Sequence, residues 1–277
     1  MDAHFRPYTL GKRLKSMLKV DLRRMFSMRL VYILVASCLV MPILILVMTT
    51  MMDGIVSVNP QTGEETVIEG FDNVWQIIGS VSSGFGAPAD PNAATAAMDM
   101  SITSMCNINM LYFILAVLVC VFVSDDFRSG YAKNLFTVRA KKGEYVASKT
   151  IVCCIGAGLM ILAFVLGSVI GGAVTGLPFT MEGFDMAGLL MCVLSKVLLV
   201  AVFVPIYLIM AVIARQKLWL SLLLSFMTGM FLFMMIPMLT PLNATAVHIL
   251  LCLAGSLGFG FGLGAGSKKI LESASLV

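Results

Sequence analysis

Long apolar runs separated by short polar segments dominate the chain from residue 31 to residue 265. A hydrocarbon core about 30 Å thick is crossed by about 20 helical residues at about 1.5 Å each. The first run begins too far along the chain and is too long for a cleaved signal peptide. The pattern predicts an all-α, polytopic membrane protein in which six transmembrane helices form one domain, residues 1–277. The six spans are expected at about 31–51, 107–123, 150–172, 187–213, 218–238 and 246–265.

Lysine and arginine gather on one side of the predicted membrane. Eight of the 19 basic residues precede the first span and six lie in the loop 124–149, whereas the loops 52–106, 173–186 and 239–245 contain none. By the positive-inside rule, both termini and the 124–149 loop are cytoplasmic and residues 52–106 form an extracellular loop of a plasma-membrane protein. The net charge of +4 does not point to nucleic acid as a partner, because the positive charge lies beside membrane spans.

The segment 9–29 interleaves apolar and basic residues with helical spacing. This pattern is typical of an amphipathic helix in the inner interface, with its apolar face toward the acyl chains and its basic side chains toward anionic lipid headgroups. We expect the helix to anchor the topology, and an additional contact with a partner protein is left open. The apolar positions are Leu10, Leu14, Met17, Leu18, Leu22, Met25 and Phe26.

The extracellular loop 52–106 is long enough to fold. Apolar residues from Ile68 to Val81 recur mostly at three- or four-residue intervals, which predicts a short helix, and residues 92–105 can form a second. The loop holds seven acidic residues and no basic ones. It either binds cationic material or is a solvated spacer, and we favour the spacer because basic residues are excluded from outer loops anyway.

Glycines recur at four-residue intervals in the sixth predicted span, at Gly258, Gly262 and Gly266. Missing side chains let helices approach closely in a membrane. We expect this series to pack within the chain, with packing between subunits as the alternative. A similar series occurs in the third span, at Gly156, Gly167, Gly171 and Gly172.

Lys196 is the one basic residue outside the cytoplasmic segments, and it lies inside the fourth span. A buried ammonium is costly in hydrocarbon, so its side chain must face a cavity, find a partner or extend to the headgroups. Structural accommodation is the favoured interpretation, and a place on the cargo pathway is the alternative.

The sequence lacks the residues that several classes of function require. The spans carry no acidic residue, and His248 is their single histidine, which disfavours a carrier coupled to protons or sodium. The seven cysteines show no Cys-x-x-Cys or Cys/His spacing that would hold a metal. No phosphate-binding GxxxxGK[ST] motif is present, so we expect no ATP hydrolysis by this chain and no enzyme activity of its own.

The cytoplasmic loop 124–149 concentrates charge, with nine charged residues among its 26. Asp125 and Asp126 are followed by an apolar stripe at helical spacing, which predicts a short amphipathic helix, a turn, and a helix that extends into the third span. Aromatic and aliphatic positions ringed by charge are typical of a docking surface for another protein. A charged face on the inner leaflet is the alternative. The stripe consists of Phe127, Tyr131, Leu135 and Phe136.

The stretch DDFRSGYAKNLFTVRAKKGEYVASKTIV resembles the first cytoplasmic loop of the type-2 ABC transporter permease family. In that family an acidic residue precedes G-x-x-K-N-L, and a basic turn leads to Y-x-x-S-K at the start of the third span. The turn TVRAKKGEYV departs from the family, in which a Pro or Ser and an Arg are usual. The matching positions are Asp126, Arg128, Gly130, Lys133, Asn134, Leu135, Gly143, Tyr145, Ser148 and Lys149.

The resemblance implies the permease subunit of an ATP-driven exporter. In that family two permeases, identical or paralogous, pair with two separate ATPase subunits, which bind the ATP and Mg²⁺. The interfacial helix and the coupling helix of the first cytoplasmic loop rest against the ATPase. Carried onto this chain, the ATPase-coupling residues are Phe26, Asp125, Asp126, Phe127, Arg128, Tyr131, Lys133, Asn134 and Leu135.

The resemblance leaves the cargo open among peptides, including antimicrobial ones, lipids and drugs. No cofactor is expected on this chain. A membrane sensor or assembly scaffold that transports nothing, or a secondary carrier, are the rival functions, and an ATPase partner would separate the exporter from both.

Overall fold

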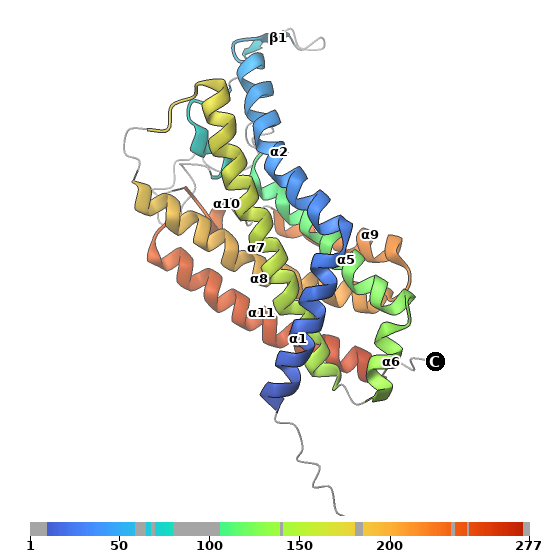
Figure 1. Cartoon of the computed structure of the whole chain (residues 1–277). Coiled ribbons are helices and arrows are strands. Elements are labelled where there is room, and N and C mark those ends of the chain that lie inside the picture. Colours follow the sequence, from blue (N-terminus) through green and yellow to red (C-terminus); the bar gives the residue numbers. More distant parts are fainter. Residues whose placement is uncertain are drawn as a thin grey trace, which may run out of the picture.

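The computed structural model describes residues 10–58, 65–67, 70–79, 106–138, 141–180, 185–233, 236–242 and 244–273, and these residues are mostly helical (Figure 1). The helices are α1 (Leu10–Ser27), α2 (Arg29–Met52), α5 (Leu111–Arg128), α6 (Tyr131–Val138), α7 (Lys142–Thr175), α8 (Met186–Ala214), α9 (Leu218–Phe233), α10 (Ile236–Leu239) and α11 (Ala246–Ser273), with the 3-10 turns η1 (Val74–Ile77) and η2 (Ile108–Met110). A small antiparallel hairpin pairs β1 (Val56–Val58) with β2 (Glu65–Val67).

Five helices in the described part of the chain are long and apolar enough to cross a membrane: α2, α5 with η2, α7, α8 and α11. The remaining predicted span, 218–238, is described in two parts, α9 up to Phe233 and α10 from Ile236. Helix α9 has 16 residues, or about 24 Å, which is shorter than the hydrocarbon core. A sixth crossing at 218–238 therefore stays a prediction.

The close approach of α2 and α7 depends on glycine. A β-carbon at Gly167 would overlap the carbonyl oxygen of Leu39 and lie 2.7 Å from the ring of Pro42, and one at Gly171 would lie 2.9 Å from Leu46. The glycines of the third predicted span therefore pack within the chain, as their spacing indicates. Helices α8 and α11 form a second long pair, and α9 packs against α5 and α8.

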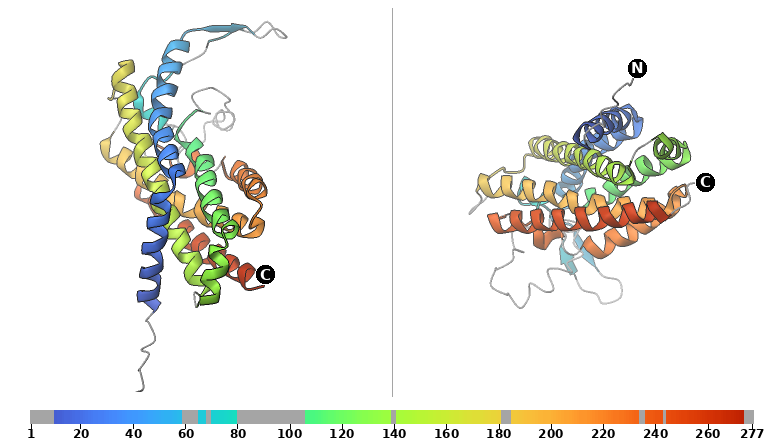
Figure 2. Two further views of the ribbon diagram at one scale, coloured as in Figure 1. Left: turned by 45° about the vertical axis from the view of Figure 1, so that its right-hand side comes forward. Right: turned by 90° about the horizontal axis from the view of Figure 1, so that it is seen from below.

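Helix α1 continues in nearly the same direction as α2 instead of lying across it (Figures 1 and 2). Its enclosed residues Met17, Asp21 and Met25 face α7, and the sulfur of Met25 lies against Gly156. The 34 residues of α7 are more than one membrane span requires, and its first turns cover part of the apolar stripe of α1, while Phe26 stays exposed. The interfacial position of 9–29 stays a prediction.

The residues just before η1, and η1 itself, pack against the C-terminal end of α7 and the residues that follow it. The indole Nε1 of Trp75 donates to the carbonyl oxygen of Phe179 at 2.8 Å, and the side-chain amide of Asn73 donates to that of Thr180 at 3.1 Å. Of the helix predicted between Ile68 and Val81, the described residues 70–79 contain a single 3-10 turn, which Asn73 caps. The second helix predicted in this loop, 92–105, lies outside the described residues.

The glycine series of α11 is not used for packing inside the chain over most of its length. A β-carbon at Gly258 or Gly262 would meet no atom within 4 Å, whereas one at Gly266 would lie 3.4 Å from Ile209. The internal packing expected from this series therefore holds at Gly266 alone. Packing of Gly258 and Gly262 between subunits stays a prediction.

Candidate functional site

Four charged side chains from three helices meet at one end of the molecule, and we call them the charge network: Asp21 and Arg24 from α1, Asp126 from α5, and Lys149 from α7. The Lys149 ammonium lies 2.9 Å from Asp21 Oδ1 and 2.7 Å from Asp126 Oδ2. Arg24 donates from Nη1 to Asp126 Oδ1 at 2.6 Å. The side chains of Asp21, Asp126 and Lys149 are 0% exposed, so the network is enclosed by protein.

Neutral groups complete the surroundings of the buried charges. The Tyr145 hydroxyl donates to Asp126 Oδ2 at 2.9 Å, and the Ser148 hydroxyl donates to Asp21 Oδ2 at 2.6 Å. The ammonium of Lys149 also lies 3.8 Å from the centroid of the Phe122 ring. The contacts of Lys149 are close ion pairs, although their angles are not those of hydrogen bonds. Two acids and two bases balance in charge, which is what a buried ionic cluster requires.

Helical spacing places these side chains together. On α7, Tyr145, Ser148 and Lys149 stand at i, i+3 and i+4, so they share one face. On α1, Asp21 and Arg24 are three residues apart and also share a face. Each helix therefore presents its part of the network as a preformed set.

A sharp turn positions α6 beside the network. Gly130 takes a positive φ of 73° between α5 and α6, a conformation that glycine adopts without strain. The Tyr131 ring lies 3.9 Å from the Arg24 guanidinium, and the Phe136 ring packs edge-on against Tyr145 at 5.3 Å. The apolar side of α6 thus packs partly inside the chain, with Tyr131, Leu135 and Phe136 half-buried, and docking of another protein on this stripe stays a prediction.

The sequence-predicted coupling residues divide into two groups. Asp126 and Phe127 are buried, and Tyr131 and Leu135 are half-buried against the core. The remaining residues are exposed to solvent and can meet another protein: Phe26, Asp125, Arg128, Lys133 and Asn134.

The pKa values of two groups at the edge of the network, Arg24 and Tyr131, are both raised. Burial alone would lower the pKa of Arg24, but the carboxylate of Asp126 more than offsets this and the pKa is raised above its usual value. Burial raises the pKa of the Tyr131 hydroxyl, and the negative charge of Asp21 adds to the rise against the opposing effect of Arg24. Arg24 therefore stays charged and Tyr131 stays neutral over the physiological range of pH.

The last helix is fastened to the same region. The Lys142 ammonium, in the first turn of α7, donates to the carbonyl oxygen of Leu271 at 2.5 Å. Carbonyl groups in the last turn of a helix lack partners within the helix, and a cation satisfies them well. The end of α11 is therefore held against the start of α7, next to α6 and at the end of the molecule where α1 begins (Figures 1 and 2).

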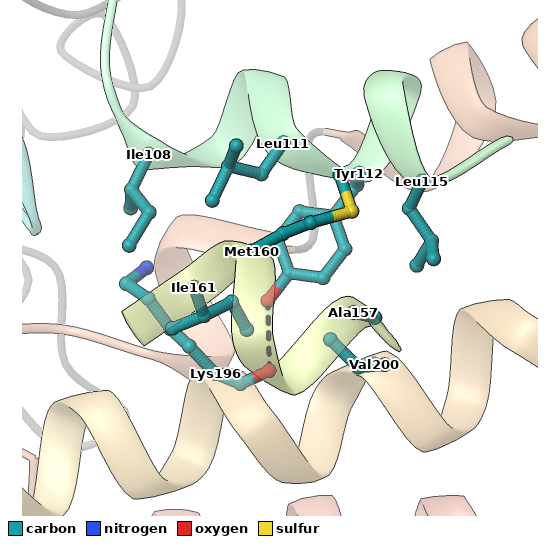
Figure 3. A pocket seen from close by; sticks show the side chains of 9 residues that line it. All are labelled: Ile108, Leu111, Tyr112, Leu115, Ala157, Met160, Ile161, Lys196 and Val200. Carbon is teal, nitrogen blue, oxygen red and sulfur yellow. Dashed lines mark hydrogen bonds between the residues drawn. The ribbon is translucent and has the colours of Figure 1, made fainter. Parts of the chain in front are cut away.

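Lys196 occupies a different region, in the first half of α8. Its ammonium donates to Asn109 Oδ1 at 3.1 Å and to Thr240 Oγ1 at 2.9 Å, and the residue is 1% exposed. Its carbonyl oxygen accepts from the Tyr112 hydroxyl at 3.2 Å (Figure 3). An apolar gap between α5, α7 and α8 adjoins it, with room for about one water. Lys196 is therefore buried and joins α8 to the segments that carry Asn109 and Thr240.

The described residues contain neither a disulfide bond nor a cluster of metal-ligand side chains. All seven cysteines are free thiols. Within the described ranges, no three His, Cys, Asp or Glu side chains lie together in a way that would hold a metal ion.

A family model described as ABC-2 family transporter protein matches residues 22–232, which covers the last third of α1, the whole of α6 and most of the spans. The chain belongs to the ABC-2 transporter family. It is therefore a multi-pass membrane protein whose family consists of transport subunits that are not ATPases themselves and that work with an ABC ATPase subunit. No curated protein and no solved structure matches the chain.

Asp21 belongs to the charge network of this ABC-2 transporter subunit, but it is not among the site residues predicted from the sequence. A signal was present, because Asp21 lies four residues after Met17 and four before Met25, on the apolar side of an otherwise basic helix. An acid in the apolar stripe of an amphipathic helix indicates a buried cationic partner. That partner, Lys149, belongs to the Y-x-x-S-K motif and is far away in sequence.

Proposed function

We propose that this chain is the permease subunit of an ATP-driven exporter in the plasma membrane, and that a separate ABC ATPase subunit drives it through the 124–149 loop. The charge network is the observation that carries the proposal, because it joins α1, α5 and α7 directly beside α6. Family membership supports the transport role. ATP and Mg²⁺ bind to the ATPase partner, since this sequence has no phosphate-binding loop.

The docking surface for the ATPase is the solvent face of the turn between α5 and α6. Arg128, Lys133 and Asn134 are exposed there, with the carboxylate of Asp125 beside them, 56% exposed. Phe26 is 38% exposed on neighbouring α1. Charged groups around a small apolar contact are suited to an interface that binds in one orientation.

Movement of α6 reaches the spans through the buried network. Asp126 belongs to the last turn of α5, and it contacts Arg24 of α1 and Lys149 of α7. Lys142 extends the connection to α11. A packed ionic cluster resists separation of its members because unpaired buried charges are costly, so these helices move together as a rigid body.

The arrangement of charge sets the orientation. The end that carries the charge network, α6 and the end of α11 is the basic end of the chain, and it faces the cytoplasm by the positive-inside rule. Both termini are then cytoplasmic, which requires an even number of crossings and gives α9 with α10 the role of the sixth. A second permease copy or a paralogue completes the cargo path, and the cargo is a peptide (antimicrobial peptides included), a lipid or a drug.

Reconstitution tests this function. The chain is placed in proteoliposomes alone, or together with the ATPase subunit with which it co-purifies, and cargo movement is followed after ATP is added. Movement is expected only when both subunits and hydrolysable ATP are present. Solute movement by this chain alone would instead indicate a secondary carrier, and a chain that binds no ATPase would indicate a sensor or a scaffold.

A further inference from the structure

The turn between α8 and α9 holds an arginine in a backbone conformation that favours glycine. Arg215 follows the end of α8 with φ 51° and ψ −108°, and in the described part of the chain no other residue except glycine has a positive φ. The amide of Lys217 donates to the carbonyl oxygen of Ala214 at 3.1 Å, so Arg215 is the second residue of a tight turn. Glycine, asparagine and aspartate dominate tight turns with a positive φ at this position. An arginine there strains the backbone, which indicates a use for its side chain.

The two cations of this turn have no acidic partner. Arg215 is half-buried and Lys217 is exposed, and within the described residues neither forms an ion pair. By contrast, Arg24, Lys149 and Lys268 are each paired with an acid. Both charges of the turn are therefore available to an anion from outside the chain.

Trp219 places the turn beside lipid. Its indole is 66% exposed in the first turn of α9, and at helical spacing it shares one side of this helix with Leu223, Met227 and Met230, which are 46%, 55% and 63% exposed. Figures 1 and 2 show α9 at the edge of the molecule, where it packs against α5 and α8. An exposed apolar side suits acyl chains, and an indole at its end suits the boundary with the headgroups. A lipid beside Trp219 then has its headgroup near both cations of the turn.

We propose that the α8–α9 turn binds the headgroup of an anionic phospholipid, with Arg215 as the phosphate ligand and Lys217 as a second positive charge. A guanidinium donates two parallel hydrogen bonds to phosphate oxygens, which a single ammonium cannot do. The apolar side of α9 favours lipid over an acidic protein, because a soluble partner would not cover it. The proposal rests on the membrane location of α9 and does not depend on transport.

Fluorescence quenching of Trp219 tests the choice of lipid. The full chain carrying Trp75→Phe, which leaves Trp219 as its single tryptophan, is placed in phosphatidylcholine nanodiscs. An equal minor fraction of either phosphatidylglycerol or phosphatidylcholine with brominated acyl chains is then added. Bromine quenches an indole that it touches, so brominated phosphatidylglycerol is expected to quench at least threefold more. Equal quenching by the two lipids would overturn the proposal. The measurement is repeated with Trp75 kept, because this buried indole adds the same background in both lipids.

Charge variants test the assignment of the ligands. Arg215→Gln is expected to lower the preference for phosphatidylglycerol at least twofold, and Arg215→Lys to restore only part of it, because a point charge attracts the phosphate without the paired hydrogen bonds. Lys269→Gln is the matched control, since it removes one exposed positive charge from α11. An equal effect of Arg215→Gln and Lys269→Gln would contradict a site at this turn.

Arg215→Gly separates lipid binding from a purely structural role. Glycine relieves the backbone at this φ but removes the guanidinium. We therefore expect an unfolding midpoint in neutral nanodiscs at or above that of the unchanged chain, together with the same loss of lipid preference as in Arg215→Gln. A lower midpoint with an unchanged lipid preference would overturn the proposal. So would an unchanged preference in Arg215→Gln with a loss of bound ATPase subunit, because the turn would then bind protein.

Discussion

The Lys149 ammonium lies 2.7 Å from Asp126 Oδ2, and neither side chain has any exposed surface. A cation from α7 is thus held by an acid from the end of α5, beside the helix α6 that forms the proposed docking turn. Removing one member of a buried ion pair leaves its partner charged and unpaired, which typically costs about 3–5 kcal/mol. The stability of the protein and the transmission of movement should therefore depend on the same few atoms.

Lys149→Met should strongly destabilise the protein. Methionine retains the apolar stem but leaves Asp21 and Asp126 short of a cation, so we expect a loss of about 3–5 kcal/mol in the free energy of unfolding. A lower midpoint of thermal unfolding in detergent would show it. Lys269→Met, at an exposed position on α11, is the control and should leave the midpoint unchanged. Similar midpoints for both variants would contradict the structural importance of the network.

Asp126→Asn should uncouple ATP hydrolysis from transport without preventing assembly. Asparagine keeps the shape of the side chain but removes the charge that faces Arg24 and Lys149, while the exposed docking residues are unchanged. We expect the ATPase to co-purify within about twofold of the normal amount while cargo efflux falls at least tenfold, about 1.4 kcal/mol in coupling. Glu272→Gln, at an exposed acid of α11, serves as the control. Normal efflux in Asp126→Asn would remove this residue from the coupling path.

Lys133→Glu should weaken binding of the ATPase subunit. Lys133 is exposed on α6, and reversal of its charge places an acid where the proposed interface has a base. The amount of ATPase retained on the affinity-purified permease should fall at least tenfold, and Arg128→Glu should act in the same direction. Lys269→Glu makes the same charge change at the same end of the molecule and should retain the ATPase. If all three variants bind equally, the docking turn has been misplaced.

Gly167→Ala should separate α2 from α7. The added methyl group would overlap the Leu39 carbonyl, so the helices must move apart, at a cost of about 1–3 kcal/mol. Gly158→Ala lies on the same helix with no atom within 4 Å of the new β-carbon and should be neutral or slightly stabilising. Thermal unfolding of the two variants in one detergent measures the difference, and equal midpoints would contradict the close packing.

Lys196→Met should reduce stability while leaving efflux nearly normal. The substitution removes both hydrogen bonds to Asn109 and Thr240, and leaving a buried acceptor unpaired costs about 1–3 kcal/mol. Efflux at equal expression should stay within about twofold. A larger change in efflux, or a changed preference among cargoes, would place Lys196 on the cargo pathway, which is the alternative interpretation of its sequence position.

Hydropathy predicted the long spans because burial in lipid demands apolar residues over a fixed length. At 218–238 the described residues give α9 and α10, neither of which is long enough alone to cross a membrane, so a sixth span there stays a prediction. The glycines of α7 and α11 look alike in sequence, yet Gly167 packs closely and Gly262 meets nothing. Spacing shows that a helix could approach, and it contains no information on which helix does so.

The candidate site was predictable in its location and less so in its composition. The loop motif indicated Asp126 and its neighbours as site residues. An apolar stripe, however, has the same sequence pattern whether it binds a partner protein or packs on the core of its own chain. The contact of Phe136 with Tyr145 shows that part of the stripe packs on the chain's own core. Asp21 was missed, and its pairing with Lys149 could not be predicted, because that pairing depends on the fold and not on nearby residues.

Asp21 lies near the start of the chain, so it is synthesised long before the residues that bind its carboxylate. The hydroxyl of Ser148 that binds it belongs to a residue 127 positions later. At a ribosomal rate of about 5–20 residues per second, the carboxylate waits on the order of ten seconds for its partners to emerge. The packing of α1 cannot be completed during that interval. A nascent chain halted before α7 should therefore remain a substrate for quality-control proteases.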